Sequence, residues 1–217
     1  MISTATYSKF LTMSWSGPLV AVAFSFLPLA PSAAAATVAQ GATLSDGAGG
    51  IVLTNGNPLA LQAHSSYSNE VTTPTSEWVW DAADATQSQT LTFQFLFDLS
   101  GYNTSTASLT GLWGIDNAGD IFLNGNLISS LPDETAVSNF SSLTAILVNA
   151  GSSFFLSGAN VLVFSLFNDA PPAAFRAAVT VSADAAAVPL PAAFPLFAAG
   201  LSAMGFMGWR RKRKALA

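Results

Sequence analysis

The alternation of apolar with mostly polar side chains constrains this sequence more than any other feature. Between positions 91 and 99 every second residue is apolar, namely Leu91, Phe93, Phe95, Phe97 and Leu99. A period of two places this set on one face of a β-strand, whereas a helix would scatter it. Residues 107–115 and 175–181 repeat the alternation, and residues 161–167 are apolar on both sides except at Ser165, as in a central strand. The chain therefore predicts an all-β fold.

Turn-forming residues separate the expected strands. The segment Asp116–Gly119 is one such turn, and the pair Asn124–Gly125 favours the positive φ angles of a tight type I′ hairpin. Gly158 and Asn160 introduce the next strand in the same way. Residues 37–187, about 150 in number, suit one domain. Roughly eight or nine short strands with such turns predict a single β-sandwich, specifically a jelly roll.

Charge is distributed unevenly along the chain. Of the seven cations, Lys9 and five near the C-terminus lie outside residues 37–187, so Arg176 is the one cation of that region. All twelve acids lie within it, which gives it a net charge near −11. Such a domain is a poor partner for nucleic acid, because phosphates require cationic contacts. Its acidity is compatible with solubility, divalent-cation binding or neutral glycans.

The N-terminal segment has the pattern of a signal peptide. Lys9 is the only charge in the first 45 residues, and residues 19–29 form a short apolar stretch. Pro31 and the small-residue run Ala33–Ala36 follow, so we expect residues 1–36 to be removed after Ala35 or Ala36. The expected partners are the secretion translocon and signal peptidase. The alternative is an uncleaved anchor, for which the apolar stretch is short.

The C-terminal segment, residues 188–217, combines three features. It opens with the proline-punctuated motif Val188, Pro189, Leu190 and Pro191, and an uncharged apolar run occupies residues 192–209. A basic cluster follows: Arg210, Arg211, Lys212, Arg213 and Lys214. The run is just long enough to cross a bilayer as a helix, and the cluster would stay in the cytoplasm. The chain N-terminal to it would then lie on the far side of the membrane.

These three features, in this order, resemble the PEP-CTERM sorting signal of Gram-negative bacteria. Leu190 departs from the family pattern, because it stands where the name-giving glutamate usually lies, while Val188, Pro189, Pro191 and Ala192 match. The resemblance implies that the helix anchors the protein transiently in the inner membrane. Exosortase would then cut near the motif and pass the protein to the cell surface or extracellular matrix. The alternative is an ordinary anchor that stays in the inner membrane.

A second resemblance covers about residues 91–183 and concerns the galactose-binding-like jelly roll. It rests on the segments Gly114–Asn117 and Ile121–Asn126 and on the spacing of Phe154, Gly158, Asn160, Leu162 and Asn168. In that family these positions serve mainly turns and strand ends. The resemblance therefore implies the fold, and sugar binding does not follow from the fold alone.

Trp78 and Trp80 are the candidate glycan-binding residues. Two positions apart, they would share one face of a strand, with Glu77 and Asp81 beside them to bind sugar hydroxyls. The alternative is that one or both fill the core. Trp113 is expected in the core because it lies within a regular strand. Tyr67 is expected to be exposed because its surroundings are polar.

Asp116, Asn117 and Asp120 are the candidate calcium ligands, because they supply clustered hard oxygens within one expected turn. Their spacing does not match an EF-hand, and the alternative is that such residues cap their own turn. A structural calcium ion is the only cofactor that the sequence suggests. The chain has no cysteine, which excludes disulfides and thiolate metal sites.

The sequence gives little support to catalysis. His64 is the only histidine, it lies in a polar stretch, and we expect it to be a solvated loop residue without a catalytic partner. The first interpretation is therefore a non-enzymatic cell-surface or matrix protein, structural or adhesive, linked to exopolysaccharide. The alternative is a carbohydrate-binding module, and the third interpretation is a polysaccharide hydrolase.

Overall fold

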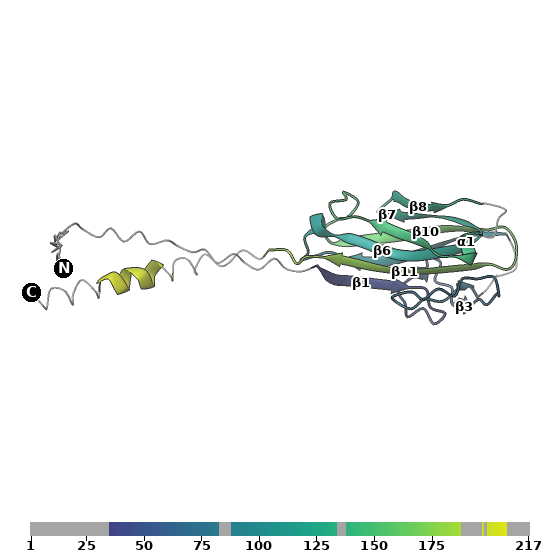
Figure 1. The fold of residues 1–217 in the computed structure, drawn as a ribbon, viewed down its shortest axis with the longest axis horizontal. Helices are drawn as coiled ribbons and strands as arrows, with labels where there is room; N and C mark the ends of the chain where they lie inside the picture. The colour runs from purple at the N-terminus through teal and green to yellow at the C-terminus, as the bar shows by residue number, and fades with distance from the viewer. Residues whose placement is uncertain (1–34, 83–87, 134–137, 188–196, 198, 208–217) are drawn as a thin grey trace, which may run out of the picture. The chain divides into compact units, whose positions relative to one another are not determined.

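In the computed structural model, residues 35–82, 88–133, 138–187, 197 and 199–207 are described. The strands form two antiparallel sheets, which lie face to face as a sandwich (Figure 1). Sheet A holds β1 (Ala36–Ala42), β3 (Leu59–Leu61), β4 (Val79–Asp81), β6 (Ser108–Asp116), β9 (Thr144–Val148) and β11 (Ala174–Ala183). Sheet B holds β2 (Val52–Leu53), β5 (Gln89–Asp98), β7 (Ala118–Leu123), β8 (Asn126–Leu131) and β10 (Ala159–Asn168). A 3-10 turn η1 (Thr104–Thr106) and a short helix α1 (Ser138–Ser141) complete the described elements of the sandwich. The predicted all-β sandwich is confirmed.

The predicted period of two accounts for the core. The alternating residues of β5 point inward and are buried, whereas Leu96 on the opposite face is 64% exposed. Phe93 meets Phe175 of sheet A with ring centroids 4.8 Å apart, and Phe164 of β10 meets the same ring at 5.0 Å. These three rings, all fully buried, join the two sheets.

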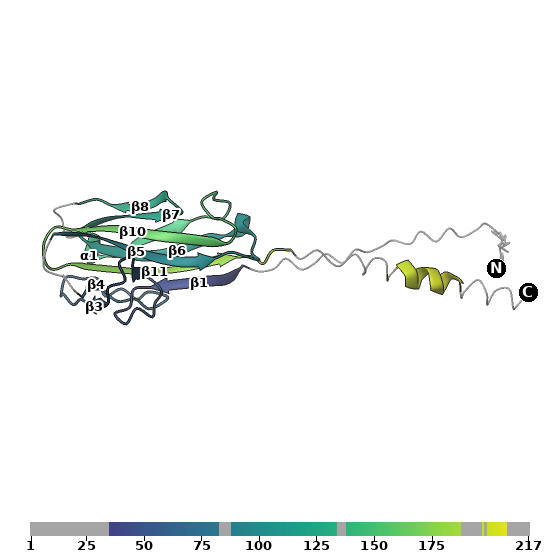
Figure 2. The ribbon, with the colours of Figure 1, turned by 180° about the vertical axis from the view of Figure 1, so that it is seen from behind.

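The chain passes repeatedly between the sheets. From β5 to β6 and from β6 to β7 it crosses between them, and it crosses again at each step from β8 to β11. As a result β10 lies between β5 and β7 in sheet B, and β11 lies beside β6 in sheet A (Figure 2). The apolar run 161–167 is therefore in a central strand, as predicted. The number of described strands, eleven, exceeds the predicted eight or nine, because the very short β2, β3 and β4 carry no periodic pattern.

The Asn124–Gly125 hairpin is confirmed. Asn124 has φ +50° and Gly125 has φ +82°, and the turn joins β7 to β8 with Leu123 opposite Asn126. Asn124 also anchors the turn to its surroundings, because its Oδ1 accepts a hydrogen bond from the Val161 backbone N–H at 2.9 Å. The turn thus fixes the hairpin against β10.

The first and last strands of the sandwich are neighbours. β1 pairs with β11 from Ala36 opposite Ala183 to Ala42 opposite Ala178. β11 continues past β1 toward β4, where Phe175 faces Val79, and its other side pairs with β6. β11 is therefore a central strand, and its first six residues are all buried.

Both targeting segments fall largely outside the described residues. Of the predicted signal peptide 1–36, only residues 35 and 36 are described, and the sorting motif 188–191 and basic cluster 210–214 are not. Residues 197 and 199–207 of the predicted span 192–209 are helical. Among the described residues, no helix combines the length and apolarity that a membrane crossing requires.

Candidate functional site

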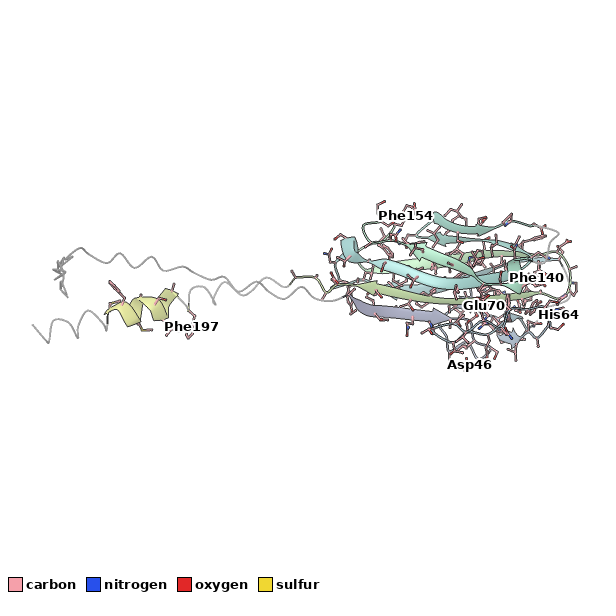
Figure 3. All side chains as sticks on the ribbon, in the orientation of Figure 1. Asp46, His64, Glu70, Phe140, Phe154 and Phe197 are labelled. Carbon is pink, nitrogen blue, oxygen red and sulfur yellow. The ribbon has the colours of Figure 1, made fainter. Side chains whose placement is uncertain are left out.

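A hollow of about 570 Å³ opens on the outer face of sheet A. Its lining comprises residues 61–65, residues 67–69, residues 76–78 and Arg176. The segment between β3 and β4 forms most of it, and the Gln62 N–H closes the base of this segment by donating to the Trp78 carbonyl at 2.8 Å. Figure 3 shows His64, Glu70 and Phe140 at the same end of the sandwich.

A small aromatic cluster lies under the hollow. Tyr67 and Trp78 stack on each other with ring centroids 4.8 Å apart, and Phe140 of α1 meets Tyr67 edge-on at 5.7 Å. The Trp78 indole N–H donates to the Ser68 carbonyl at 2.8 Å. Tyr67 and Trp78 are only 8% and 7% exposed, so the expectation that Tyr67 is exposed is wrong. Because the two rings are buried and stack on each other, little of either ring face is available for stacking against a sugar.

The predicted platform of Trp78 and Trp80 is wrong. Trp80 is fully buried in the main core, 6.4 Å from Phe93, and its indole N–H donates to Gln89 Oε1 at 3.1 Å. Trp78 belongs to the separate cluster under the hollow. The physical reason is that β4 begins only at Val79. Trp78 therefore lies outside the strand, and the two rings do not share one of its faces. Trp113 is fully buried, as predicted.

Arg176 reaches from β11 into the hollow and holds its loop in place. Its Nε donates to Ser76 Oγ at 2.9 Å, Nη1 to the Ser68 carbonyl at 3.0 Å, and Nη2 to the Glu70 carbonyl at 2.9 Å. The residue is 7% exposed, and this burial lowers the pKa of the guanidinium, while the Glu70 charge acts in the opposite direction. In the sequence Arg176 is distinctive only because it is the single cation of residues 37–187. That observation predicted no role for it.

The two glutamates near the hollow are hydrogen-bonded elsewhere. Glu70 Oε1 accepts from the Leu143 N–H at 2.9 Å and from Ser68 Oγ at 3.0 Å, which lowers the pKa of that exposed carboxyl. Glu77 Oε2 accepts from the Ser45 N–H at 2.8 Å. Both carboxylates therefore brace loops of the site.

A buried hydroxyl–carboxylate pair lies below the aromatic cluster. Tyr67 Oη donates to Asp116 Oδ2 at 3.1 Å. Burial raises the pKa of Tyr67 far above its usual range, with a contribution from the Asp116 charge. Burial also raises the pKa of Asp116, although the Tyr67 hydrogen bond and the His64 charge oppose it. The site therefore contains a carboxylate that is held in an unfavourable environment.

The structure separates the carboxylates of the predicted calcium site. β6 ends at Asp116 in sheet A, whereas β7, which carries Asp120, belongs to sheet B. Ile115 and Ile121 point into the core, so the adjacent Asp116 and Asp120 point outward from opposite sheets. Asn117 Oδ1 accepts from the Asp169 N–H at 2.8 Å, as a turn-capping residue does. No cluster of three or more histidine, aspartate or glutamate side chains suited to a metal occurs among the described residues.

His64 is exposed at the rim of the hollow, as the sequence predicts. Its Nδ1 accepts from the Ser66 N–H at 3.3 Å, and its ring lies 5.4 Å from that of Tyr67. The lining of the hollow thus includes His64, Arg176, Glu77, Gln62 and Asn69. Four of these residues belong to the segment between β3 and β4, and folding brings Arg176 to them from about a hundred residues further along the chain.

No protein-family model matches the chain. No curated protein matches it either. Among solved structures, it is similar to a family 35 carbohydrate-binding module from Clostridium thermocellum, with 11% identity, 65% of this chain and 97% of that chain covered, and a TM-score of 0.35.

A family 35 module from Paenibacillus barcinonensis gives 16% identity, coverage of 65% and 97%, and a TM-score of 0.34. A cyclase from Fischerella sp. TAU gives 10% identity, coverage of 69% and 100%, and a TM-score of 0.36. At this level of similarity neither a family nor a ligand follows for the chain.

Proposed function

We propose that this chain is an exported, non-enzymatic protein of the cell surface or extracellular matrix that binds polysaccharide in the hollow beside Arg176. In this proposal the sandwich is a jelly roll of the galactose-binding-like type. The observation that carries the binding role is the lining of the hollow, because Gln62, Asn69, Glu77 and Arg176 all line one open concavity. Amides and carboxylates are the groups that pair with sugar hydroxyls.

Recognition in this site depends mainly on hydrogen bonds. The faces of Tyr67 and Trp78 are stacked on each other, so the rings support the floor of the hollow and do not form a platform for a pyranose. Gln62 is half-buried and Asn69 is exposed, and both line the hollow. We therefore assign to these two amides the ligand-binding role that was predicted for Trp78 and Trp80.

The absence of an enzymatic role is part of the proposal. A glycosidase of the usual type needs two carboxyl groups about 5–9.5 Å apart on either side of the scissile bond. Glu77 is the only carboxylate among the described residues that line the hollow, and it is bound to the Ser45 N–H. This lining supports holding a glycan more than cleaving one.

Export is proposed on the sequence of the two termini. The motif 188–191, the apolar run 192–209 and the cluster 210–214 would act together as a sorting signal for exosortase. The apolar run would anchor the protein in the inner membrane until cleavage. The acidic domain, 37–187, would then reach the cell surface, where exopolysaccharide is the expected partner.

Glycan binding is tested with the full chain in detergent solution and a panel of neutral and acidic polysaccharides. Gln62→Ala and Asn69→Ala should each weaken binding severalfold, because each removes a hydrogen-bonding group from the hollow. The matched control is Gln94→Ala on the outer face of sheet B, which removes the same amide far from the site. If no polysaccharide in the panel binds, the proposed binding role is wrong.

Export is tested by fractionation of cells with and without exosortase. We expect a shortened protein at the surface only when exosortase is present, and the full-length protein in the inner membrane when it is absent. A shortened protein in both strains would refute sorting by exosortase, whatever the outcome for glycan binding.

A further inference from the structure

We infer that the hollow selects a sugar that carries an anionic substituent, a carboxylate or a sulfate, and that Arg176 binds this substituent. The inference rests on the proposed glycan-binding function and adds the chemical class of the ligand. The structural observation behind it is the buried guanidinium of Arg176, a residue that lines the hollow.

Arg176 has the surroundings of a charge that lacks a contacting counter-ion. It is 7% exposed, and its three hydrogen bonds all end on neutral oxygens, those of the Ser76 hydroxyl and of the Ser68 and Glu70 carbonyls. These bonds use three of the five N–H groups of a guanidinium. Within the described part of the chain, two N–H groups are left for a ligand in the hollow that Arg176 lines.

The carboxylates nearest in sequence to these contacts are committed to other donors. The Glu70 carboxylate binds the Leu143 N–H and the Ser68 hydroxyl, and only the backbone carbonyl of Glu70 contacts Arg176, so the carboxylate acts on the guanidinium through space. Glu77 binds the Ser45 N–H. A buried charge without a contacting opposite charge is costly. An anionic group in the hollow would supply that charge and form charge-assisted hydrogen bonds with the guanidinium fork.

The charge of the rest of the domain limits the kind of glycan. With twelve acids and one cation in residues 37–187, the domain repels a densely charged polyanion at long range. A single anionic substituent on an otherwise neutral sugar avoids most of this repulsion and still reaches Arg176. The ligand class is therefore a sparsely charged acidic glycan.

The test compares three ligands that differ only at carbon 6: glucose, glucuronate and glucose 6-sulfate. With the full chain in detergent solution, calorimetry or ligand-observed NMR should show an acidic ligand binding at least about tenfold more tightly than glucose, equivalent to about 1.4 kcal/mol. The two acidic arms distinguish carboxylate from sulfate. Glucuronamide, which has the shape of glucuronate without its charge, should bind like glucose.

Two variants assign the preference to this site. Arg176→Gln should abolish the preference for the acidic ligand, whereas Arg176→Lys should retain part of it and preserve the fold. Glu77→Gln keeps an oxygen for the Ser45 N–H and removes a negative charge from the hollow, so it should raise the affinity for acidic ligands severalfold relative to that for glucose.

The outcomes separate the two proposals. Equal affinity for glucose, glucuronate and glucose 6-sulfate would overturn the anionic selectivity and leave glycan binding intact. If no sugar or polysaccharide binds, both fail. If Arg176→Gln does not fold, the comparison of glucuronate with glucuronamide and the Glu77→Gln variant decide the question, and an acidic preference unmoved by Glu77→Gln would place the anion elsewhere.

Discussion

Asn124 and Asn160 join a hairpin turn to the loop that precedes β10. Asn124 Nδ2 donates to Asn160 Oδ1 at 2.8 Å and to the Phe154 carbonyl at 2.7 Å. Asn160 is 3% exposed, and its Nδ2 donates to the Leu156 and Gly158 carbonyls at 2.9 and 2.7 Å. Its side chain thus substitutes for the backbone pairing that this irregular loop lacks.

Asn160→Asp should destabilise the domain by about 2–4 kcal/mol, because it removes two buried donors and adds a buried charge. Thermal unfolding of the full chain measures the loss. The matched control is Asn149→Asp, which makes the same change at an exposed loop position and should alter stability by less than about 0.5 kcal/mol. Equal effects of the two substitutions would show that the Asn160 hydrogen bonds contribute little.

Gly125→Ala should cost about 1 kcal/mol for backbone reasons alone. Gly125 has φ +82°, which residues with a Cβ rarely adopt, yet nothing lies within 4 Å of the position where the Cβ would be. Gly125→Asn should cost less, because asparagine tolerates this conformation. Chemical denaturation of the three chains gives the comparison, and an Asn variant less stable than the Ala variant would contradict this explanation.

Asp116→Asn should stabilise the protein at neutral pH. Burial raises the pKa of Asp116 above its ordinary 3.8, so the folded state binds a proton that the unfolded state has already released. Stability is therefore lost as the pH rises from about 3.8 through the raised pKa, and above it the loss is complete. Asparagine has no charge to bury and can still accept from the Tyr67 hydroxyl.

Melting temperatures of the wild type and Asp116→Asn across the pH range provide the measurement. The gain should be largest near pH 7 and vanish below about pH 3.8. Tyr67 and His64 interact with the Asp116 carboxylate in the wild type, and the variant retains both residues. A gain that does not depend on pH would mean that packing, and not charge, distinguishes the two side chains.

Trp80→Ala should destabilise the domain by about 3–5 kcal/mol, because it empties a fully buried site in the main core. Trp80→Phe should cost less, since much of the ring volume is kept. Unfolding curves measure both changes. Glycan affinity of the fraction that remains folded should not change, and a selective loss of binding without loss of stability would restore Trp80 as a ligand contact.

The long strands could be predicted because their side chains obey a local rule. The alternation from Leu91 to Leu99 directly reports the buried face of β5, and Asn124–Gly125 reports its own backbone conformation. Both signals are contained in a few consecutive residues. They predict which faces of the long strands are buried, and most of the core follows from these faces.

The candidate site could not be predicted in the same way. Arg176 meets Ser68 and Ser76 across about a hundred residues of sequence, and the loop they belong to has no periodic pattern. The only indication in the sequence was compositional, because Arg176 is the single cation of an acidic domain. The prediction for Trp78 and Trp80 failed because their spacing implied a strand that includes both residues, whereas β4 begins only at Val79.

β11 carries Arg176 and ends at Ala183, beside the start of β1. If a polysaccharide is held at Arg176 while the C-terminal segment is attached to the cell, tension between them runs along the backbone of a single strand. The ladders with β6 and β1 would then be loaded in shear, where many hydrogen bonds must break together and not one after another. The order of strands would thus make the domain a stiff mechanical link between a cell and the matrix around it.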